Sequence, residues 1–342
     1  MATIRDVARR ARVSVATAAR ALGGYGYVSA KTRAKVLRVA RALDYHPDAI
    51  ARSMIKGRTH TLAAIVSDNT NPFFAAVVRG IEDVVLAAGY ALMLCNTDED
   101  PEKESMYLRT IRQKRVDGLI LSPTGGPAAP FRRLLASGTP IVQVDRRLEA
   151  LETDAVLIDN RAGVRAAIEH LIRLGHRRIG IISGPRRVST GRERLDAYLD
   201  TLRAAGIGID DELMLEGTFK ERSGYELVGR FLRLRRRPGA IFVANNLMTI
   251  GALLGLKEAG VRIPEEMAVV GFDDMNWAPI LTPPLTTVAQ PGYALGGAAA
   301  QLLMQRLTSQ RTGQPQTVVF QPRLVVRESC GAALVPSAQK PS

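Results

Sequence analysis

Short apolar runs alternate with amphipathic stretches along most of this chain, and few folds can accommodate such a pattern. The runs predict strands at 62–66, 91–95, 118–121, 141–144, 155–158, 179–182, 240–243 and 268–270. Helical spacing of apolar residues predicts helices near 72–88, 101–114, 160–174, 191–205, 222–234, 246–259 and 290–307. This order indicates an α/β fold of parallel βαβ units with helices on both sheet faces. Because seven or eight strands over about 270 residues exceed one comfortable domain, two similar lobes are expected.

The N-terminal 45 residues show no strand pattern and predict short helices instead. Thr3, Ser14 and Ser29 are residue types that cap helices, and each stands directly before a helical stretch. Apolar spacing predicts one helix over Ile4–Arg10 and a second over Ser14–Leu22, joined by a turn at 11–13. Two short helices joined by a tight turn describe a helix-turn-helix.

The basic charge of the chain is concentrated at the same end. The net charge is +14, and residues 1–60 hold 13 Lys and Arg against 3 Asp and Glu, a net +10. The other 282 residues hold 34 against 30, a net +4. A local excess of this size indicates a polyanion partner, and double-stranded DNA fits a helix-turn-helix.

The second helix of a helix-turn-helix points its first turn at base edges in the major groove. Here that turn holds Val15, Ala16 and Thr17, with Arg20 one turn further on. Arginine can donate two hydrogen bonds to guanine, which is worth about 1–3 kcal/mol of discrimination between bases. Charge and spacing alone leave one alternative open, a small helical bundle with a solvated basic face.

Several other protein classes find no support in the sequence. Two distant cysteines, Cys95 and Cys330, exclude a disulfide scaffold and fit a reducing compartment. Nucleotide-binding, hydrolase and zinc motifs are missing, and the four histidines have no metal-ligand spacing. We therefore expect no enzyme activity, no metal and no cofactor. The start lacks a signal-type apolar stretch and prolines interrupt the uncharged span 275–305, so we expect a cytoplasmic protein without a membrane segment.

A set of short motifs runs in order along the chain. The motifs are Thr3-Ile-Arg-Asp-Val-Ala, Val13-Ser-Val-Ala-Thr17, Val28-Ser-x-x-Thr-Arg33, Tyr45-x-Pro47, Ala51-Arg-Ser53, Asn71-Pro-Phe-Phe74, Gln113-Lys-Arg-Val-Asp-Gly118, Gly175-His-Arg-Arg-Ile-Gly180 and Pro283-Pro-Leu-Thr-Thr287. Each motif alone is weak, but the ordered set is highly specific. On these residues the chain resembles the LacI/GalR family of transcription regulators, and the resemblance extends over almost its whole length.

The resemblance implies a definite organisation. A helix-turn-helix headpiece would span 1–46, a hinge helix and linker 47–60, a two-lobed core like periplasmic sugar-binding proteins 61–328, and a flexible tail 329–342. The chain would cross between the lobes three times. A homodimer would bind a roughly palindromic operator, and a small molecule between the lobes would change operator affinity. The tail contains prolines and no heptad repeat, so a tetramer-forming coil is not expected.

The DNA-binding positions of the family carry over residue by residue. Base readers correspond to Val15, Ala16 and Arg20, and phosphate contacts, which position without specifying, to Thr3, Ser14, Thr17 and Tyr45. In the hinge, Ala51 is small enough for two helices to pack closely, and Met54 stands where the family has a leucine wedge for the minor groove. The family's usual Gly or Asn in the headpiece turn is Arg12 here, which costs about 1–2 kcal/mol if its backbone is left-handed.

The resemblance also implies an effector site between the lobes. Its positions are Phe73, Phe74, Asp145, Arg146, Arg194, Phe219, Asn245 and Asp273. Asp, Asn and Arg side chains complement sugar hydroxyls, and the carboxyl ends of strands are where α/β sheets bind ligands. A carbohydrate is expected, and three classes stay open: a neutral sugar, a sugar acid or phosphate, and a nucleobase or other ligand.

The leading interpretation is a repressor whose operator affinity responds to this small molecule. A transport-type sugar-binding protein without a DNA role is the alternative, although the basic N-terminal segment and the missing secretion signal count against it. A Rossmann-type enzyme would need a phosphate-binding fingerprint that the sequence lacks. The sequence leaves open whether the effector releases or promotes DNA binding.

Overall fold

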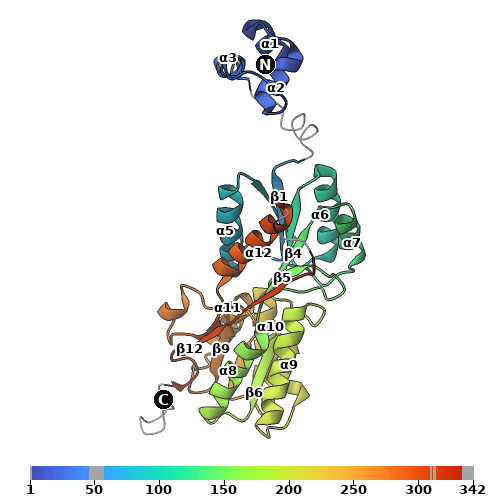
Figure 1. Cartoon of the computed structure of the whole chain (residues 1–342). Helices are drawn as coiled ribbons and strands as arrows, with labels where there is room; N and C mark the ends of the chain where they lie inside the picture. Colours follow the sequence, from blue (N-terminus) through green and yellow to red (C-terminus); the bar gives the residue numbers. More distant parts are fainter. Residues whose placement is uncertain (1, 46–57, 309, 311–312, 333–342) are drawn as a thin grey trace. The chain divides into compact units, whose positions relative to one another are not determined.

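The computed structural model describes residues 2–45, 58–308, 310 and 313–332 (Figure 1). Contacts divide the chain into two units. The first contains the described residues up to His60 together with Arg115–Asp117, and the second contains the remainder. Most of the expected hinge, including Ala51 and Met54, lies outside the described residues, so the roles assigned to these two positions stay predictions.

In its described residues the first unit folds as three helices, α1 (Ile4–Ala11), α2 (Val15–Gly23) and α3 (Ala30–Ala42). Each begins at a predicted cap, a hydroxyl that accepts a hydrogen bond from a backbone N–H three residues on. Arg12 follows α1 in the left-handed conformation, with φ 53°, and turns the chain toward α2. The helices enclose a small core of Val7, Ala8, Ala11, Ala18, Ala21, Val36 and Ala40. This arrangement confirms the predicted helix-turn-helix.

The second unit is built on two sheets, each with six strands in the described part of the chain. The strand order is β11-β5-β4-β3-β1-β2 in the first lobe and β12-β10-β9-β8-β6-β7 in the second. The strands are β1 (Thr61–Val66), β2 (Ala91–Asn96), β3 (Gly118–Leu121), β4 (Ile141–Val144), β5 (Asp154–Ile158), β6 (Ile179–Ser183), β7 (Met214–Glu216), β8 (Ala240–Val243), β9 (Ala268–Phe272), β10 (Thr286–Ala289), β11 (Thr317–Phe320) and β12 (Arg323–Val325). They pair in parallel, apart from β10 with β12. The two sheets confirm the α/β class and the two lobes.

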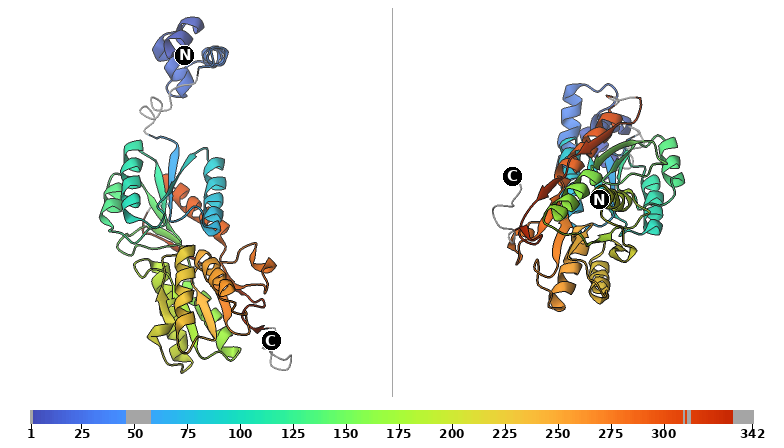
Figure 2. Two further views of the ribbon diagram at one scale, coloured as in Figure 1. Left: turned by 180° about the vertical axis from the view of Figure 1, so that it is seen from behind. Right: turned by 90° about the horizontal axis from the view of Figure 1, so that it is seen from below.

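Helices cover both faces of each sheet (Figures 1 and 2). The first lobe carries α5 (Pro72–Ala87), α6 (Pro101–Lys114), α7 (Ala129–Ala136) and α12 (Gly292–Leu307), and the second carries α8 (Asn160–Arg173), α9 (Ser189–Ala204), α10 (Glu221–Arg233) and α11 (Asn246–Glu258). The backbones of α5 and α12 are in close contact. A Cβ atom on Gly296 of α12 would lie only 1.9 Å from the carbonyl oxygen of Val77 in α5. Among the described residues, no helix has the length and apolar character to span a membrane.

The chain crosses between the lobes three times, as the family resemblance implied. It leaves the first lobe after β5, returns after β10 to form α12 and β11, and crosses again to form β12. Each lobe is therefore assembled from segments that are separate in the sequence.

Five of the α-helices and strands in the described residues were not predicted: α7, β7, β10, β11 and β12. Three of these, β7, β11 and β12, are edge strands of only three or four residues. Most residues of these three strands are exposed or half-buried, so few of their positions require an apolar side chain. The pattern of apolar runs was therefore too weak to reveal them.

The flexible tail expected over 329–342 was placed too early. Ser329 and Cys330 are 1% and 0% exposed. The Ser329 hydroxyl accepts a hydrogen bond from the backbone N–H of Thr286 and donates one to the carbonyl oxygen of Val269, at 2.8 and 2.7 Å. These contacts tie the segment into the second lobe, so the core extends at least to Cys330.

Candidate functional site

The first unit presents an exposed face at the start of α2. Val15 is 44% exposed, and Ala16 and Arg20 are exposed beside it, whereas Ala18 and Ala21 on the same helix are buried in the core. A branched apolar side chain on such a surface adds nothing to the core but can contact a thymine methyl group. The three predicted base readers therefore share one accessible face.

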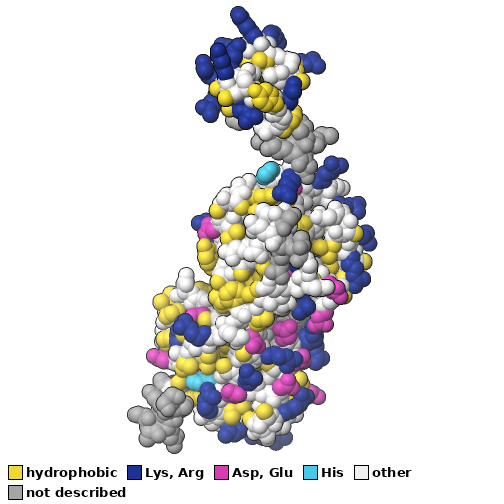
Figure 3. All heavy atoms as spheres, viewed as in Figure 1, with side chains coloured by type: hydrophobic (Ala, Val, Ile, Leu, Met, Phe, Trp, Pro, Cys, Tyr) yellow, Lys and Arg dark blue, Asp and Glu magenta, His cyan; other side chains and the backbone are white. Residues whose placement is uncertain are grey.

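The predicted phosphate contacts lie mostly at helix starts. Thr3 and Ser14 are the N-caps of α1 and α2, and the Ser14 hydroxyl lies 2.8 Å from that of Thr17. Helix N-termini favour phosphate because their free N–H groups point outward. Tyr45 is partly buried against the headpiece core. Figure 3 shows Lys and Arg side chains spread over the visible face of this unit.

In the second unit, one cavity gathers all eight predicted effector positions. The residues enclose about 350 Å³ of space that no protein atom fills, part of it open to solvent. The first lobe contributes Phe73 and Phe74 from the first turn of α5 and Asp145 and Arg146 after β4; the second contributes Arg194 from α9 and Phe219, Asn245 and Asp273 after β7, β8 and β9. These positions follow the carboxyl ends of parallel strands, where α/β sheets bind ligands.

Five further residues line the cavity and were not predicted: Asp68, Asn71, Glu99, Thr190 and Gln290. Asp68 and Glu99 stand shortly after β1 and β2, as Asp145 stands after β4. A search for polar residues shortly after predicted strands would have identified Asp68 and Glu99 as candidate lining residues. Gln290 follows β10, a strand that the sequence did not reveal, so no signal marked it.

The backbone is strained at four of the lining residues. Glu99, Asp145, Phe219 and Asp273 have φ values of 64°, 65°, 64° and 76°. Non-glycine residues seldom adopt this left-handed conformation, and it is typical of functional sites, where the surrounding fold holds it in place.

Arg146 is held rigidly at the wall of the cavity. Its guanidinium donates two hydrogen bonds to the carboxylate of Glu99, at 2.6 and 2.7 Å, and lies over the ring of Phe219, 5.2 Å from its centroid. Burial opposes the charged form, but the charge and hydrogen bonds of Glu99 outweigh it and raise the pKa of Arg146. The side chain is therefore a fixed cation that already has its counter-ion.

Arg194 is the second buried cation of the cavity. Its Nε donates to Oδ1 of Asn160 at 2.8 Å, one terminal nitrogen donates to the carbonyl oxygen of Ala244 at 2.5 Å, and the guanidinium stacks 3.7 Å from the ring centroid of Phe272. Burial lowers the pKa of Arg194, against the nearby charges of Asp273 and Asp145. Two of its donors are used within the protein.

The carboxyl groups of Asp145 and Asp273 are fully buried at the same cavity. Burial raises the pKa of Asp145 to about 6, although the charges of Arg146 and Arg194 act in the opposite direction. Burial also raises the pKa of Asp273, whose carboxylate accepts hydrogen bonds from the side chain of Gln290 and the backbone N–H of Asn246.

The lining of the cavity carries more negative than positive groups. It includes the carboxyl groups of Asp68, Glu99, Asp145 and Asp273 but only the guanidinium groups of Arg146 and Arg194. Within the described part of the chain, the buried Oε1 atom of Gln290 accepts no hydrogen bond. The buried Nε atom of Arg146 donates no hydrogen bond there either, so the cavity offers an acceptor without a donor and a donor without an acceptor.

Polar contacts join the two lobes beside the cavity. The ammonium group of Lys220 in the second lobe bonds to the carboxylates of Asp68 and Asp98 in the first. The side-chain amide of Asn246 donates to Oδ1 of Asn71 at 2.8 Å. Any movement that opened the cavity would have to break these bonds.

Family models match two parts of the chain. Residues 3–48 match the model described as "Bacterial regulatory proteins, lacI family", and residues 168–330 match the "Periplasmic binding protein-like domain". These matches fall on the helix-turn-helix unit and on the part of the core that contains most of the second lobe.

Relatives match over nearly the whole chain. It is 37% identical to the HTH-type transcriptional repressor PurR of Photobacterium profundum, covering 96% of this chain and 98% of the relative, and 36% identical to the ribose operon repressor of Escherichia coli K12, covering 96% and 100%. The structure matches that of the Lac repressor dimer bound to operator and the anti-inducer ONPF, with a TM-score of 0.81, 26% identity and coverage of 96% and 99%. These relatives are named as repressors. The chain therefore belongs to the lacI family of bacterial regulatory proteins.

Proposed function

We propose that this DNA-binding transcriptional regulator binds a neutral polyhydroxylated molecule of sugar size in the cavity between its lobes, and that this ligand changes its affinity for a DNA operator. The charge of the cavity lining carries the choice of ligand class. Carboxyl groups outnumber guanidinium groups, and both guanidinium groups already have partners within the protein. A sugar acid or phosphate would add repulsion to this site, so the presence of two arginines does not favour an anion.

The remaining groups of the cavity suit a sugar. The rings of Phe73, Phe74 and Phe219 offer apolar surface to the C–H face of a sugar ring, while Asp145 and Gln290 offer hydrogen-bond acceptors. Hydroxyl groups are donors as well as acceptors, and they supply what these oxygens lack. The name of one relative, ribose operon repressor, supports a sugar-related role.

For the DNA side, we propose that a homodimer reads a roughly palindromic operator. Base contacts would come from Val15, Ala16 and Arg20, and phosphate contacts from Thr3, Ser14, Thr17 and Tyr45. The hinge residues Ala51 and Met54 would pack between the two protomers and wedge the minor groove. Exposure of the α2 face and the basic charge of this unit support the proposal.

Control by the ligand would act through the lobes. A sugar bonded to both walls of the cavity stabilises the arrangement in which Lys220 and Asn246 reach the first lobe. Such a ligand can shift the equilibrium only by its difference in affinity for the two arrangements. A cellular regulator of this kind has no need of the membrane, and we place it in the cytoplasm.

A thermal-shift panel tests the ligand class. Neutral pentoses and hexoses, the matching sugar acids and phosphates, and nucleobases are added separately to the purified protein. A ligand at 100 times its dissociation constant adds about 2.7 kcal/mol of apparent stability. Stabilisation by neutral sugars is expected, and stabilisation only by an acid, a phosphate or a nucleobase would overturn the assignment.

Operator binding tests the coupling. An operator is selected from random duplexes with the full chain, and its affinity is measured at several salt concentrations with and without the ligand. Binding should weaken steeply with salt, whereas a transport-type binding protein would show no such binding. Arg194→Ala and Asp273→Ala should keep operator affinity but lose about 1–3 kcal/mol of ligand binding. Variants that bind the ligand normally would refute the site.

A further inference from the structure

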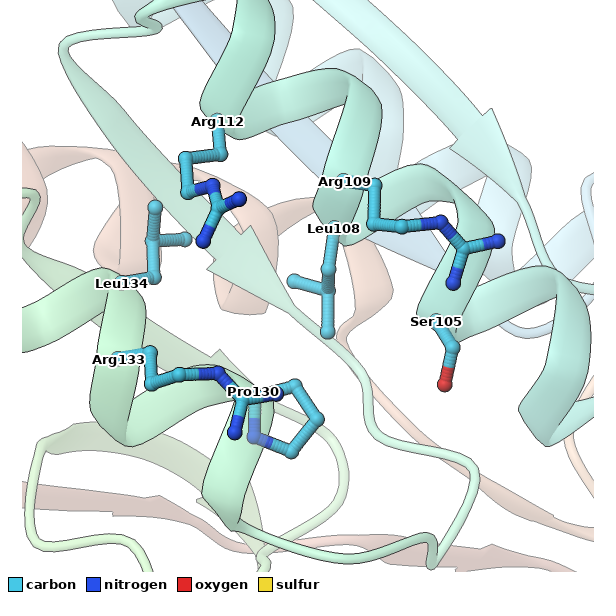
Figure 4. A pocket seen from close by; sticks show the side chains of 7 residues that line it. All are labelled: Ser105, Leu108, Arg109, Arg112, Pro130, Arg133 and Leu134. Carbon is cyan, nitrogen blue, oxygen red and sulfur yellow. The ribbon is translucent and has the colours of Figure 1, made fainter.

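The first lobe has a second concave feature, on the side of its sheet covered by α6 and α7. This α6–α7 groove is lined by Ser105, Leu108, Arg109, Arg112, Pro130, Arg133 and Leu134 (Figure 4). It shares no residue with the cavity between the lobes. We propose that the α6–α7 groove binds an acidic amphipathic helix of a partner protein.

The floor of the groove is apolar. Leu108 of α6 and Leu134 of α7 are 6% and 4% exposed, and Pro130 stands beside them at the start of α7. The groove contains about 700 Å³ of empty space. A floor of this kind, between two parallel walls, is suited to the aliphatic side chains along one face of a helix.

The rim of the groove is basic, and its charge is not balanced locally. Over their full lengths α6 and α7 have six basic residues against Glu102 and Glu104, and Glu104 is buried and accepts a hydrogen bond from the backbone N–H of Thr124. Arg109, Arg112 and Arg133 are exposed, and no carboxylate among the described residues forms an ion pair with any of the three. Three uncompensated cations around an apolar floor favour a partner with carboxylates beside an apolar face.

Another groove, on the second lobe, lacks this imbalance. It lies between α8 and α9 and is lined in part by Glu169, Arg173 and Asp200. The guanidinium of Arg173 forms an ion pair with the carboxylate of Glu169, with N and O 3.9 Å apart. The guanidinium of Arg161 pairs with the carboxylate of Asp200 at 3.0 Å. Arginine is common in both lobes, but among the described residues Arg109, Arg112 and Arg133 form no ion pair, whereas Arg173 pairs with Glu169.

The placement of the three cations favours a helix over a phosphate or nucleic acid. Figure 4 shows the guanidinium groups of Arg109, Arg112 and Arg133 on different sides of the groove, not converging on one point. A single phosphate could reach only part of the set. Carboxylates three or four residues apart on a helix are separated by roughly 5–6 Å and could meet the cations one by one. A DNA backbone would leave the apolar floor uncovered.

A synthetic peptide provides the test. A labelled helix of about 18 residues carries leucines along one face and glutamates on the flanks of that face. Its binding is measured on the full chain saturated with operator, so that the basic N-terminal unit is already occupied by DNA. The pair Arg112→Glu with Arg133→Glu should weaken binding roughly tenfold, because attraction becomes repulsion. The matched pair Arg165→Glu with Arg173→Glu, in the groove between α8 and α9, should change it less than about twofold.

Three results would overturn the proposal. One is equal binding by the charge-reversed variant, once its operator affinity shows that it is folded. Another is equal binding of a peptide with the same composition in scrambled order, since the apolar floor would then have no role. The third is displacement of the peptide by inorganic phosphate at constant ionic strength or by random duplex DNA, which would identify a general anion site or a nucleic-acid surface.

Discussion

Replacing the buried carboxyl group of Asp145 by an amide should stabilise the protein at neutral pH. Asp145 is 4% exposed, and Nε of Arg146 lies 3.7 Å from its Oδ2 atom. Asparagine has nearly the same shape and accepts a φ of 65° at least as readily as aspartate. The variant Asp145→Asn therefore removes a buried charge without moving the backbone.

The magnitude follows from the pKa of this group. Burial raises the pKa of Asp145 from 3.8 to about 6, so between these pH values the folded protein holds a proton that the unfolded chain releases. Stability contributed by Asp145 is then greatest below about pH 4, falls as the pH rises through this window, and is constant above it. The difference between a pKa of 3.8 and one of about 6 corresponds to about 3 kcal/mol of stability lost at pH 7.5, which the amide should recover.

Unfolding of both proteins without ligand, at pH 7.5 and at pH 4, measures this effect. For a domain of this size 1 kcal/mol moves the melting temperature by about 2 °C, so Asp145→Asn should melt about 6 °C higher at pH 7.5. The difference should nearly vanish at pH 4, where both side chains are neutral.

A control variant, Asp274→Asn, should change stability in the opposite direction. Asp274 accepts two hydrogen bonds from Arg327, at 2.7 and 3.0 Å; burial opposes its charge, but the bonds from Arg327 and Thr287 lower its pKa. Asp274→Asn should therefore destabilise the protein at pH 7.5. If Asp145→Asn were also destabilising at pH 7.5, or if its gain persisted unchanged at pH 4, the buried charge would not be the cause.

Three further predictions concern the DNA-binding end and the tail. Arg12→Gly should remove the strain of the left-handed backbone at this position, although glycine costs entropy on folding. The net stabilisation should slow amide hydrogen exchange in α1 and α2 by up to about fivefold, and faster exchange would contradict this. Met54→Leu should bind the operator as tightly as the wild type or more so, and Met54→Ala several-fold more weakly, with random duplex unaffected; titration at one salt concentration decides it, and wild-type affinity of Met54→Ala would exclude a wedge. Deleting 333–342 should leave a dimer in sedimentation, and a tetramer that this deletion dissociates would refute the argument from the tail.

The sequence predicted those strands whose apolar residues are continuous. Leu62–Val66 is fully buried, and so are the central residues of β3, β4, β6, β8 and β9, because helices cover both faces of these strands. Strand β10 was missed although it is also interior, since it is rich in threonine. The hydroxyls of Thr286 and Thr287 are satisfied by the backbone of Arg327 and by Asp274, a tertiary arrangement that no local pattern reveals.

The same distinction holds at the cavity. The eight predicted lining residues came from the pocket positions of the family, and Asp145, Asn245 and Asp273 among them stand just after strands. Glu99 stands in the acidic run 98–100, which by itself suggests a solvated turn. Its role depends on Arg146, 47 residues further along the chain. Pairings over such distances are set by the packing of the lobe and could not be read from the sequence.

The threefold crossing of the chain has a consequence for its synthesis. The edge strands β11 and β12 follow all other strands of the described chain, so neither sheet can be completed before residues 317–325 have been synthesised. A stop codon just before Thr317 would leave two open sheet edges, the kind of surface from which aggregation starts. We expect such late nonsense mutations to behave as complete losses of the regulator, even though every residue that reads DNA would have been translated.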